Sequence, residues 1–382
     1  MPVDETKFIH ITGMYKSGTS WLSHILSAHP DIIGWREFDI IRATRTERVA
    51  PLLRRFATRY QSIRKLHPGL EQETSFGIKD KQAVIRDIFC GRGWIPLMGK
   101  EARKLAREID QSDSGSFIDE LMHLAGKDGL ARDNRPLLRA ECYTGTLGFG
   151  NSTRLALTDL LDTIKESDDM SQVPHFFFEY LQGQCEPGTR ISLKAADQVM
   201  CLRQLEQVSP QSRKIAIVRD GRDATISATH YGELMRKWDT PWIPARRSFT
   251  SQLRSWAQRI RLLSDYARDH NILILRYEDL KRDFFGMTNA LFNALDIPTS
   301  QGQLLQIHQR TDFSTVTQGR SPGQAAEHIV RKGVIGEWTS VLSDRDAELA
   351  WKVAGAELER YGYTRNGGYI DGANEQLLQA RR

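Results

Sequence analysis

The sequence has 382 residues, of which 40% are apolar and 26% are charged, and its formal net charge is +5 at pH 7. Such a chain is long enough for one large or two ordinary globular domains, and its mild positive charge suits an anionic ligand without implying nucleic acid. Its apolar runs are too short to cross a membrane, for which about 18 residues are needed. The first residues also lack the basic and apolar segments of a signal peptide, so we expect a cytoplasmic protein.

The first predicted elements are a strand, a tight loop and a helix. The apolar run 8–12 precedes Gly13-Met14-Tyr15-Lys16-Ser17-Gly18-Thr19-Ser20-Trp21, and an amphipathic segment follows. Two glycines separated by four residues have the spacing of a phosphate-binding P-loop. Such a loop directs backbone N–H groups and a helix N-terminus at one anion. The bland alternative is an ordinary strand–helix turn that contains glycine.

The position of the lysine in this loop is unusual. A nucleoside triphosphatase carries lysine directly after the second glycine, where this chain has Thr19, and the lysine of the loop is Lys16. A lysine at this place would reach a 5′-phosphate from another side than the lysine that clamps the β- and γ-phosphates of ATP. This difference favours sulfuryl transfer over phosphoryl transfer.

A region of different character lies between residues 37 and 194. It is rich in Arg and Lys, and its patterns are mostly helical. We interpret residues 43–188 as a mainly helical insertion within a single domain of residues 1–382, and we expect it to shape the acceptor site. Its segment 42–65 carries eight basic residues against Glu47 alone. That run is either a solvated helix face or a surface that grips a polyanion.

Strands and helices alternate from residue 190 onward. Apolar runs typical of strands buried on both faces of a parallel sheet lie at residues 190–194, 214–218 and 271–275. Helical patterns lie at residues 198–208, 222–236, 247–268, 283–295 and 344–361. Together with the strand at 8–12, this alternation predicts a three-layer α/β fold of the P-loop type around a central, mostly parallel sheet. The tail 366–382 is predicted to be loosely held.

Two further motifs combine cations with small or hydroxyl residues. Arg219 stands at the end of a predicted strand, where open α/β sheets bind ligands, and Ser227 lies about two turns into the next helix. Together they are suited to hold a phosphate, Arg219 by a bidentate contact and Ser227 by its hydroxyl. Later, Arg331-Lys332-Gly333 precedes Gly336-Glu337-Trp338, and its glycines allow backbone to approach an anion closely. Taken singly, these motifs are also typical of a charged turn and a basic loop.

In this order, the three motifs resemble those of the sulfotransferase family that uses 3′-phosphoadenosine 5′-phosphosulfate (PAPS). Lys16-Ser17-Gly18-Thr19-Ser20-Trp21 resembles the family's 5′-phosphosulfate loop. Arg219 to Ser227 resembles its 3′-phosphate site, and Arg331-Lys332-Gly333 its late basic motif. The resemblance covers roughly residues 8–37 and 191–363, and it leaves out most of the insertion.

The resemblance implies roles for several residues around the donor. It implies that Lys16 contacts the leaving 5′-phosphate, that Trp21 packs on the adenine and that Tyr277 lies near the nucleotide; Trp21 and Tyr277 are alternatively core residues. The product from the donor would be 3′-phosphoadenosine 5′-phosphate (PAP). Because a sulfuryl group carries less charge than a γ-phosphoryl group, no metal is expected to be required.

The catalytic base needs a separate argument, because transfer to a hydroxyl requires a group that takes the proton. Cytosolic members of the family use a histidine two residues after a strand-end lysine, but this chain has Lys194-Ala195-Ala196. The branch that resembles tyrosylprotein sulfotransferases places a glutamate after the first helix, and Glu37 has that spacing from Lys16. We therefore predict Glu37 as base and Lys194 as a charge partner of the sulfuryl oxygens. Reserve candidates for the base are Glu141, Asp197 and His230.

Two other classes of function stay open on the sequence alone. A P-loop nucleotide kinase or ATPase is the enzyme alternative, and it would depend on magnesium. A non-catalytic protein that binds nucleotide or polyanion is the second, with the segment 42–65 as its supporting feature. The acceptor, beyond its hydroxyl group, and the oligomeric state are not specified by the sequence.

Overall fold

The structure is a computed structural model, and it describes most of the chain outside the predicted insertion. The described residues are 3–36, 173–183, 185–237, 248–317, 319–324, 332–370 and 377–378. The predicted base Glu37, the cation Arg331, the reserve candidate Glu141 and the basic segment 42–65 lie outside them.

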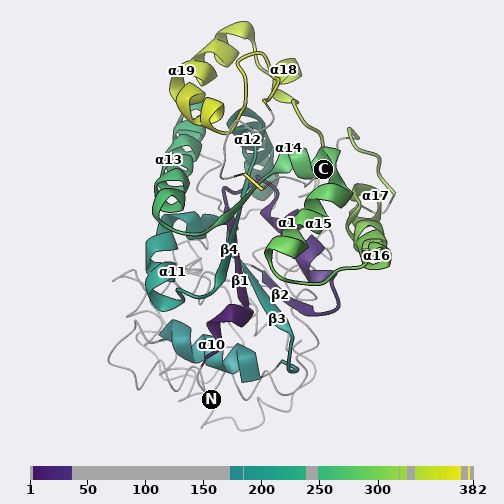
Figure 1. The fold of residues 1–382 in the computed structure, drawn as a ribbon. Coiled ribbons are helices and arrows are strands. Elements are labelled where there is room, and N and C mark those ends of the chain that lie inside the picture. Colours follow the sequence, from purple (N-terminus) through teal and green to yellow (C-terminus); the bar gives the residue numbers. More distant parts are fainter. Residues whose placement is uncertain are drawn as a thin grey trace, which may run out of the picture.

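A five-stranded parallel sheet forms the centre of the molecule (Figure 1). Its strands are β1 (Phe8–Gly13), β2 (Ile32–Arg36), β3 (Arg190–Lys194), β4 (Arg213–Val218) and β5 (Leu273–Arg276). Their order across the sheet is β2-β3-β1-β4-β5, and each neighbouring pair is parallel. The predicted α/β fold with a central parallel sheet is confirmed. One strand, β2, has no counterpart among the predicted elements.

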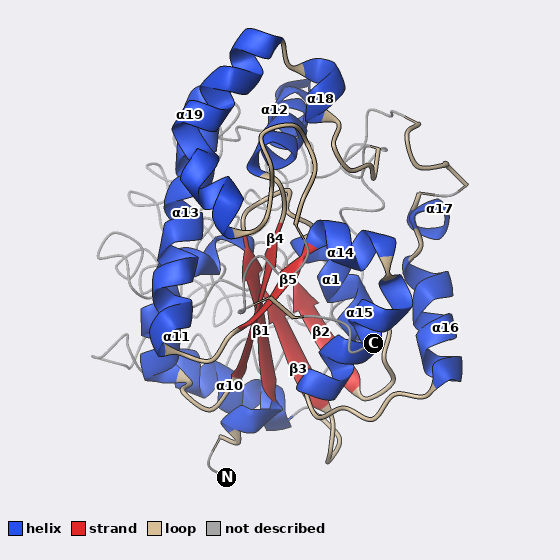
Figure 2. Cartoon of the chain, turned by 45° about the horizontal axis from the view of Figure 1, so that its top comes forward, coloured by secondary structure: helices blue, strands red, loops and turns tan. Residues whose placement is uncertain are grey.

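Helices cover both faces of this sheet (Figure 2). The helices near the N-terminus and before β4 are η1 (Glu5–Lys7), α1 (Thr19–Ser27), α10 (Val173–Gly183), η5 (Ala196–Cys201) and α11 (Leu202–Val208). Those after β4 are α12 (Gly221–Lys237), α13 (Phe249–Asp269), α14 (Tyr277–Arg282), α15 (Phe284–Ala294), α16 (Gln301–Thr311), α17 (Phe313–Val316), α18 (Trp338–Val341) and α19 (Asp344–Arg360). Among the described helices, none combines the length and apolar character that crossing a bilayer requires.

The strands bury alternate side chains on opposite faces, which accounts for their nearly continuous apolar sequences. On one face, Ala216 and Val218 join a core with Trp256 of α13 and Leu358 of α19. On the other face, the strand residues Ile9, Ile11, Ile215 and Ile217 join a second core with side chains of α1, α15 and α16. The predicted three layers are therefore present.

Several helices begin at a residue whose side chain caps them. Ser248 caps α13 by accepting a bond from the Ser251 amide, and Ser300 and Gln303 form a reciprocal capping box at α16. One predicted helix is different: the segment expected to be helical over 198–208 is a 3₁₀ turn up to Cys201 and an α-helix only from Leu202. Hence only its second half follows the predicted period.

The predicted insertion and tail are described only in part. Within 43–188, the helix α10 is described, and most of the insertion lies outside the described residues. In the tail, Tyr369 pairs with Tyr363, and the buried Leu377 pairs with Ile274 of β5. These two points of the tail contact the fold; looseness elsewhere stays a prediction.

Candidate functional site

The loop between β1 and α1 is shaped by close approach of backbone to its neighbours. A Cβ atom on Gly13, the last residue of β1, would lie 2.6 Å from the carbonyl oxygen of Ile217. Gly18 precedes α1 with a φ of 100°, a left-handed conformation that glycine adopts readily. A Cβ atom there would lie 2.7 Å from Cδ2 of Tyr277. Both glycines of the predicted P-loop are thus required by its packing.

Lys16 is held in an uncommon conformation inside this loop. Its φ of 68° is one of two positive values among the described non-glycine residues. The backbone around it is tied by a hydrogen bond from the Ser17 amide to the Met14 carbonyl, and by one from Nη1 of Arg219 to the Lys16 carbonyl, 3.2 Å long. Its ammonium lies 4.6 Å from the ring centroid of Tyr231 on α12. The loop therefore directs the lysine side chain toward α12.

The start of α1 has the features of an anion-binding site. Its N-cap residue is Gly18, which has no side chain that could cap the helix. The N–H groups of the first turn have no intrahelical partners, and the helix dipole favours a negative charge there. Ser17 is fully buried, and its hydroxyl has no hydrogen-bond partner among the residues that the structure describes. Thr19 and Ser20 follow in the first turn of the helix. A buried hydroxyl without a partner fits a bound ligand, since such a group otherwise costs stability.

Arg219 connects the loop with the late basic motif. It follows β4 and is buried, with Nη1 bonded to the Lys16 carbonyl and Nη2 donating to the Val334 carbonyl at 3.0 Å. Its guanidinium carbon lies 4.8 Å from the ring centroid of Tyr277. Its Nε is buried without a partner in the described part of the chain. Ser227, which ends the same sequence motif, is half-buried two turns into α12.

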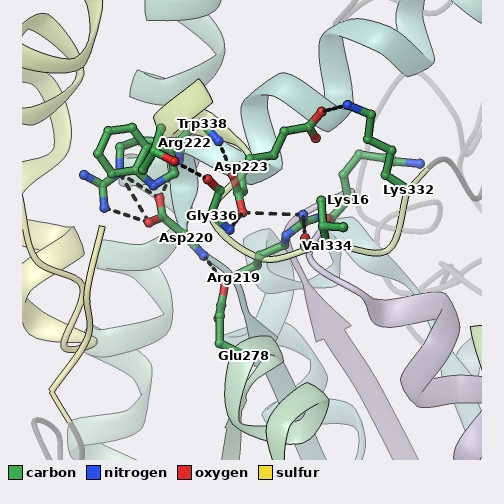
Figure 3. A network of polar contacts seen from close by, with 12 residues as sticks. Lys16, Arg219, Asp220, Arg222, Asp223, Glu278, Lys332, Val334, Gly336 and Trp338 are labelled. Atoms are coloured by element: carbon green, nitrogen blue, oxygen red, sulfur yellow. Dashed lines mark hydrogen bonds and ion pairs between the residues drawn. The ribbon is translucent and has the colours of Figure 1, made fainter. Parts of the chain in front are cut away.

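Asp223 fastens the late loop to the start of α12 (Figure 3). This buried carboxylate accepts hydrogen bonds from the Gly336 amide at 2.7 Å and from the Trp338 amide at 2.9 Å. It also lies 3.7 Å from Nη2 of Arg219. Burial raises the pKa of Asp223 above its usual value. Two segments more than a hundred residues apart in sequence therefore meet at this carboxylate.

The late basic motif is described from Lys332 onward. The Lys332 ammonium forms an ion pair with a carboxylate oxygen of Glu337 at 2.8 Å. Gly333 has a φ of 62°, and a Cβ atom on it would lie 2.5 Å from the ring of Phe313. Because this close approach leaves no room for a side chain, the motif needs glycine at this position. Arg331 lies outside the described residues.

An aromatic cluster adjoins the loop on the side of α14. Trp21 donates from Nε1 to the Thr311 carbonyl at 3.0 Å and packs edge-on against Tyr277 at 5.6 Å between centroids. The Lys281 ammonium lies 5.7 Å from the Trp21 ring and 5.8 Å from the Phe313 ring. Burial raises the pKa of the Tyr277 phenol. Trp21 and Tyr277 are thus brought together as predicted neighbours of one ligand, and Phe313 joins them.

A second, deeper network supports this edge of the sheet. Asp220 and the fully buried Arg222 form an ion pair of 2.7 Å, and the Arg222 guanidinium lies 3.7 Å from the Trp338 ring centroid. Glu278 accepts from the Asp220 amide and, at 2.7 Å, from the Tyr363 hydroxyl. Burial raises the pKa of Glu278 to about 7. The side chains of Asp220, Arg222 and Glu278 therefore all have partners within the protein.

The predicted catalytic residues are only partly within the described chain. Lys194 is buried at the end of β3, where it pairs in register with Ile11 of β1 and with Arg36 of β2. It therefore stands at the same sheet edge as the loop 13–18. Of the reserve bases, His230 is exposed and 3.6 Å from Glu233, and Asp197 belongs to η5.

Sequence reasoning missed several contributors to this edge. Phe313, Glu278 and Asp223 carry no motif signal of their own, although Asp223 lies within the stretch from Arg219 to Ser227. Their roles depend on contacts across long sequence separations. In the described part of the chain, no three His, Cys, Asp or Glu side chains gather as a candidate metal site.

The parallel sheet, the glycine loop after β1 and the uncapped α1 together define a P-loop-type α/β protein. The glycine loop and the start of α1 lie at the carboxyl ends of the strands, where such sheets bind ligands.

Within that class, a family model described as Sulfotransferase family matches residues 9–301. The chain belongs to the sulfotransferase family. A luciferin sulfotransferase from Photinus pyralis is 24% identical over 125 residues, which are 31% of this chain and 34% of that protein. The match thus spans about a third of the length of this curated relative.

Two solved sulfotransferase structures are among those similar to this chain. Mouse sulfotransferase SULT7A1, complexed with PAP, is 19% identical, with 53% of this chain and 79% of that chain covered and a TM-score of 0.38. Sulfotransferase STF9 from Mycobacterium avium is 14% identical, with 96% and 79% covered and a TM-score of 0.45.

Proposed function

We propose that this protein transfers a sulfuryl group from PAPS to a hydroxyl of an acceptor. The observation that carries the proposal is the construction of the loop 13–18. Its lysine lies inside the loop, and its carbonyl is bonded to Arg219, the first residue of the predicted 3′-phosphate motif. One ligand with phosphate groups at both its 5′ and its 3′ position would match this pair of adjoining sites.

The donor's two ends are assigned to different parts of the edge. The 5′ end would lie against the amides at the start of α1, where the Ser17 hydroxyl is buried without a partner in the described part of the chain. The 3′-phosphate would contact Arg219 through its buried Nε, together with Ser227 and the late basic motif. Trp21 and Phe313, both within 6 Å of the Lys281 ammonium, are the proposed neighbours of the adenine.

The residues at the sheet edge supply charge and a base for in-line transfer. Lys16 stabilises charge on the leaving 5′-phosphate, and Lys194 offsets charge on the sulfuryl oxygens. Glu37 takes the proton of the acceptor hydroxyl. Support for Glu37 comes from the register of the sheet: Arg36, which precedes it in sequence, pairs with Lys194. None of these steps calls for a divalent metal. The cytoplasmic location and the nature of the acceptor stay predictions.

Calorimetric titration with PAP in EDTA, compared with ATP and magnesium, tests the donor. Tight binding of PAP without metal, with weak binding of ATP, is the expected outcome. Binding of ATP alone, and only with magnesium, would establish the kinase alternative instead. Binding of PAP without sulfuryl transfer to any hydroxyl acceptor would favour a protein that binds nucleotide without turnover.

The assignment of the base is tested by Glu37→Gln. This variant should lose turnover by roughly 100-fold or more, which is the usual contribution of general base catalysis, and should keep its affinity for PAP. Single-turnover sulfation and calorimetry measure the two quantities. His230→Asn is the matched comparison, because His230 is a reserve base on α12 and is exposed. An active Glu37→Gln with an inactive His230→Asn would move the role to His230.

A further inference from the structure

We propose that Asp223 is a positioning residue of the donor site, whose carboxylate holds the loop 332–338 and Arg219 in the geometry that receives the 3′-phosphate. This inference rests on the proposed function. It concerns a residue that contacts the loop and Arg219 rather than the donor itself.

The contacts of Asp223 show a clasp between separate segments. One carboxylate oxygen accepts from the Gly336 amide and the other from the Trp338 amide, at 2.7 and 2.9 Å. Both amides belong to the segment that directly follows the late basic motif. Since Asp223 lies in the first turn of α12, its charge is also favoured by the helix dipole. The late loop is thereby pinned at two nearby points of its backbone.

The same carboxylate also sets the orientation of Arg219. It lies 3.7 Å from Nη2, the atom that donates to Val334 in the middle of the pinned loop. With Nη1 on the Lys16 carbonyl, the guanidinium is oriented by the protein at both Nη atoms. Its Nε is left, among the described residues, without a partner. Asp223 thus determines which face of Arg219 meets a ligand.

Charge and position make opposite predictions for this residue. A carboxylate close to the site repels an incoming phosphate, so its neutralisation should strengthen PAP binding if charge alone mattered. If position dominates, neutralisation should weaken PAP binding. An asparagine offers one acceptor oxygen, and its amide nitrogen would face a backbone N–H group that also donates. Asp223→Asn therefore loses one of the two loop contacts and the partner of Arg219.

The experiment compares PAP with adenosine 5′-monophosphate, which lacks the 3′-phosphate, by calorimetry. For Asp223→Asn we expect PAP affinity to fall by about tenfold or more, as for one buried hydrogen bond left unmade. Affinity for adenosine 5′-monophosphate should change by less than about twofold. The matched control is Asp296→Asn, which removes a carboxylate paired with Arg213 at the opposite end of β4 and should leave both affinities unchanged.

Each result decides the matter. Stronger or unchanged PAP binding by Asp223→Asn, or equal losses for both ligands, would overturn the positioning role. Failure of the wild-type protein to bind PAP would overturn the proposed function and this inference with it. If Asp223→Asn does not fold, hydrogen exchange on the wild-type protein gives the answer: PAP, and not adenosine 5′-monophosphate, should slow exchange of the Gly336 and Trp338 amides. Equal exchange rates with the two ligands would contradict the clasp.

Discussion

The loop 13–18 is expected to present backbone to the proposed donor, whereas the segment 220–223 carries charged side chains that the protein has already paired. In the loop, the first turn of α1 is uncapped, and the buried Ser17 hydroxyl has no partner in the described part of the chain. In the segment, the Asp220 amide, the Arg222 guanidinium and the Asp223 carboxylate all bond to other parts of the fold. The first region is suited to receive the proposed ligand, and the second to hold the neighbouring segments in place.

The two regions differ in how well their buried polar groups are satisfied. A buried donor without a hydrogen-bond partner, as the Ser17 hydroxyl is among the described residues, has lost its contact with water and so destabilises the fold. The neighbouring ion pairs and carboxylate contacts are connected to the loop, because Nη1 of Arg219 donates a hydrogen bond to the Lys16 carbonyl. We expect the paired segment to hold the loop 13–18 in one conformation, so that less conformational entropy is lost when a ligand binds.

The strongest way to break the comparison is to remove the lysine of the receiving region. Lys16→Ala should lower the turnover number by roughly 100- to 1,000-fold, the usual loss when one group that stabilises developing charge is removed. Its melting temperature should stay close to wild type, because Lys16 belongs to the receiving region. Steady-state sulfation and thermal unfolding measure the two effects. Lys352→Ala, at an exposed position on α19, is the control that should be neutral in both.

A smaller effect is expected from adding a methyl group where the loop 13–18 packs against Tyr277. Gly18→Ala places a Cβ atom 2.7 Å from the Tyr277 ring and keeps a φ of 100° that alanine disfavours. We expect a loss of stability of about 1–3 kcal/mol and weaker PAP binding, measured by urea unfolding and calorimetry.

Gly319→Ala sharpens this test, because Gly319 has a φ of 99° and a Cβ atom added there would meet nothing within 4 Å among the described residues. It should show the backbone strain alone and no change in PAP affinity. Equal behaviour of the two variants would mean that Tyr277 yields to the added methyl group.

The smallest functional effect is expected at Glu278, which accepts from the Asp220 amide of the paired region. Glu278→Gln should change stability and leave turnover nearly unaltered. Burial raises the pKa of Glu278 from 4.5 in the unfolded chain to about 7. Between these values the folded state binds more protons, so the wild-type free energy of unfolding should fall as pH rises, by at most about 3 kcal/mol.

Glu278→Gln removes that titration, and glutamine still offers an oxygen to the Asp220 amide. The variant should therefore gain stability relative to wild type between pH 5 and pH 8, as measured by urea unfolding at both values. Glu348→Gln, at a half-exposed carboxyl on α19, should show no such gain. Parallel curves for Glu278→Gln and wild type would show that Glu278 does not titrate in this range.

Much of the fold was predictable because its strands carry a strong signal. The run at 214–218 is apolar on both faces and became β4, and the glycine loop located α1. The strand β2 escaped prediction because Ile32-Ile33-Gly34-Trp35-Arg36 is short and contains glycine. That glycine is required, since a Cβ atom on Gly34 would overlap Ser27, but this contact with α1 exists only in the folded chain.

The site was predictable where residues act through local motifs. Lys16, Gly18 and Arg219 are indicated by their spacing, and the structure brings them to one edge. Asp223 and Glu278 are not, because a carboxylate whose hydrogen-bond donors lie far away in the sequence leaves no pattern near itself. Acidic residues next to basic ones also look like any solvated turn. The roles predicted for Glu37 and Arg331 stay predictions.

The sheet order has a consequence for how this polypeptide is made. β1 is synthesised before β3 and β4, yet it lies between them, and Phe8 pairs with Ile191. Until β3 and β4 have been synthesised, β1 lacks both of the strands with which it pairs. Folding must then close long loops between these strands. Arg222 donates hydrogen bonds to the carbonyls of Thr364 and Arg365, which are synthesised later than β3 and β4. This edge therefore cannot be complete before residue 365 has been synthesised, and a small molecule that needs the complete edge would not bind a shorter nascent chain.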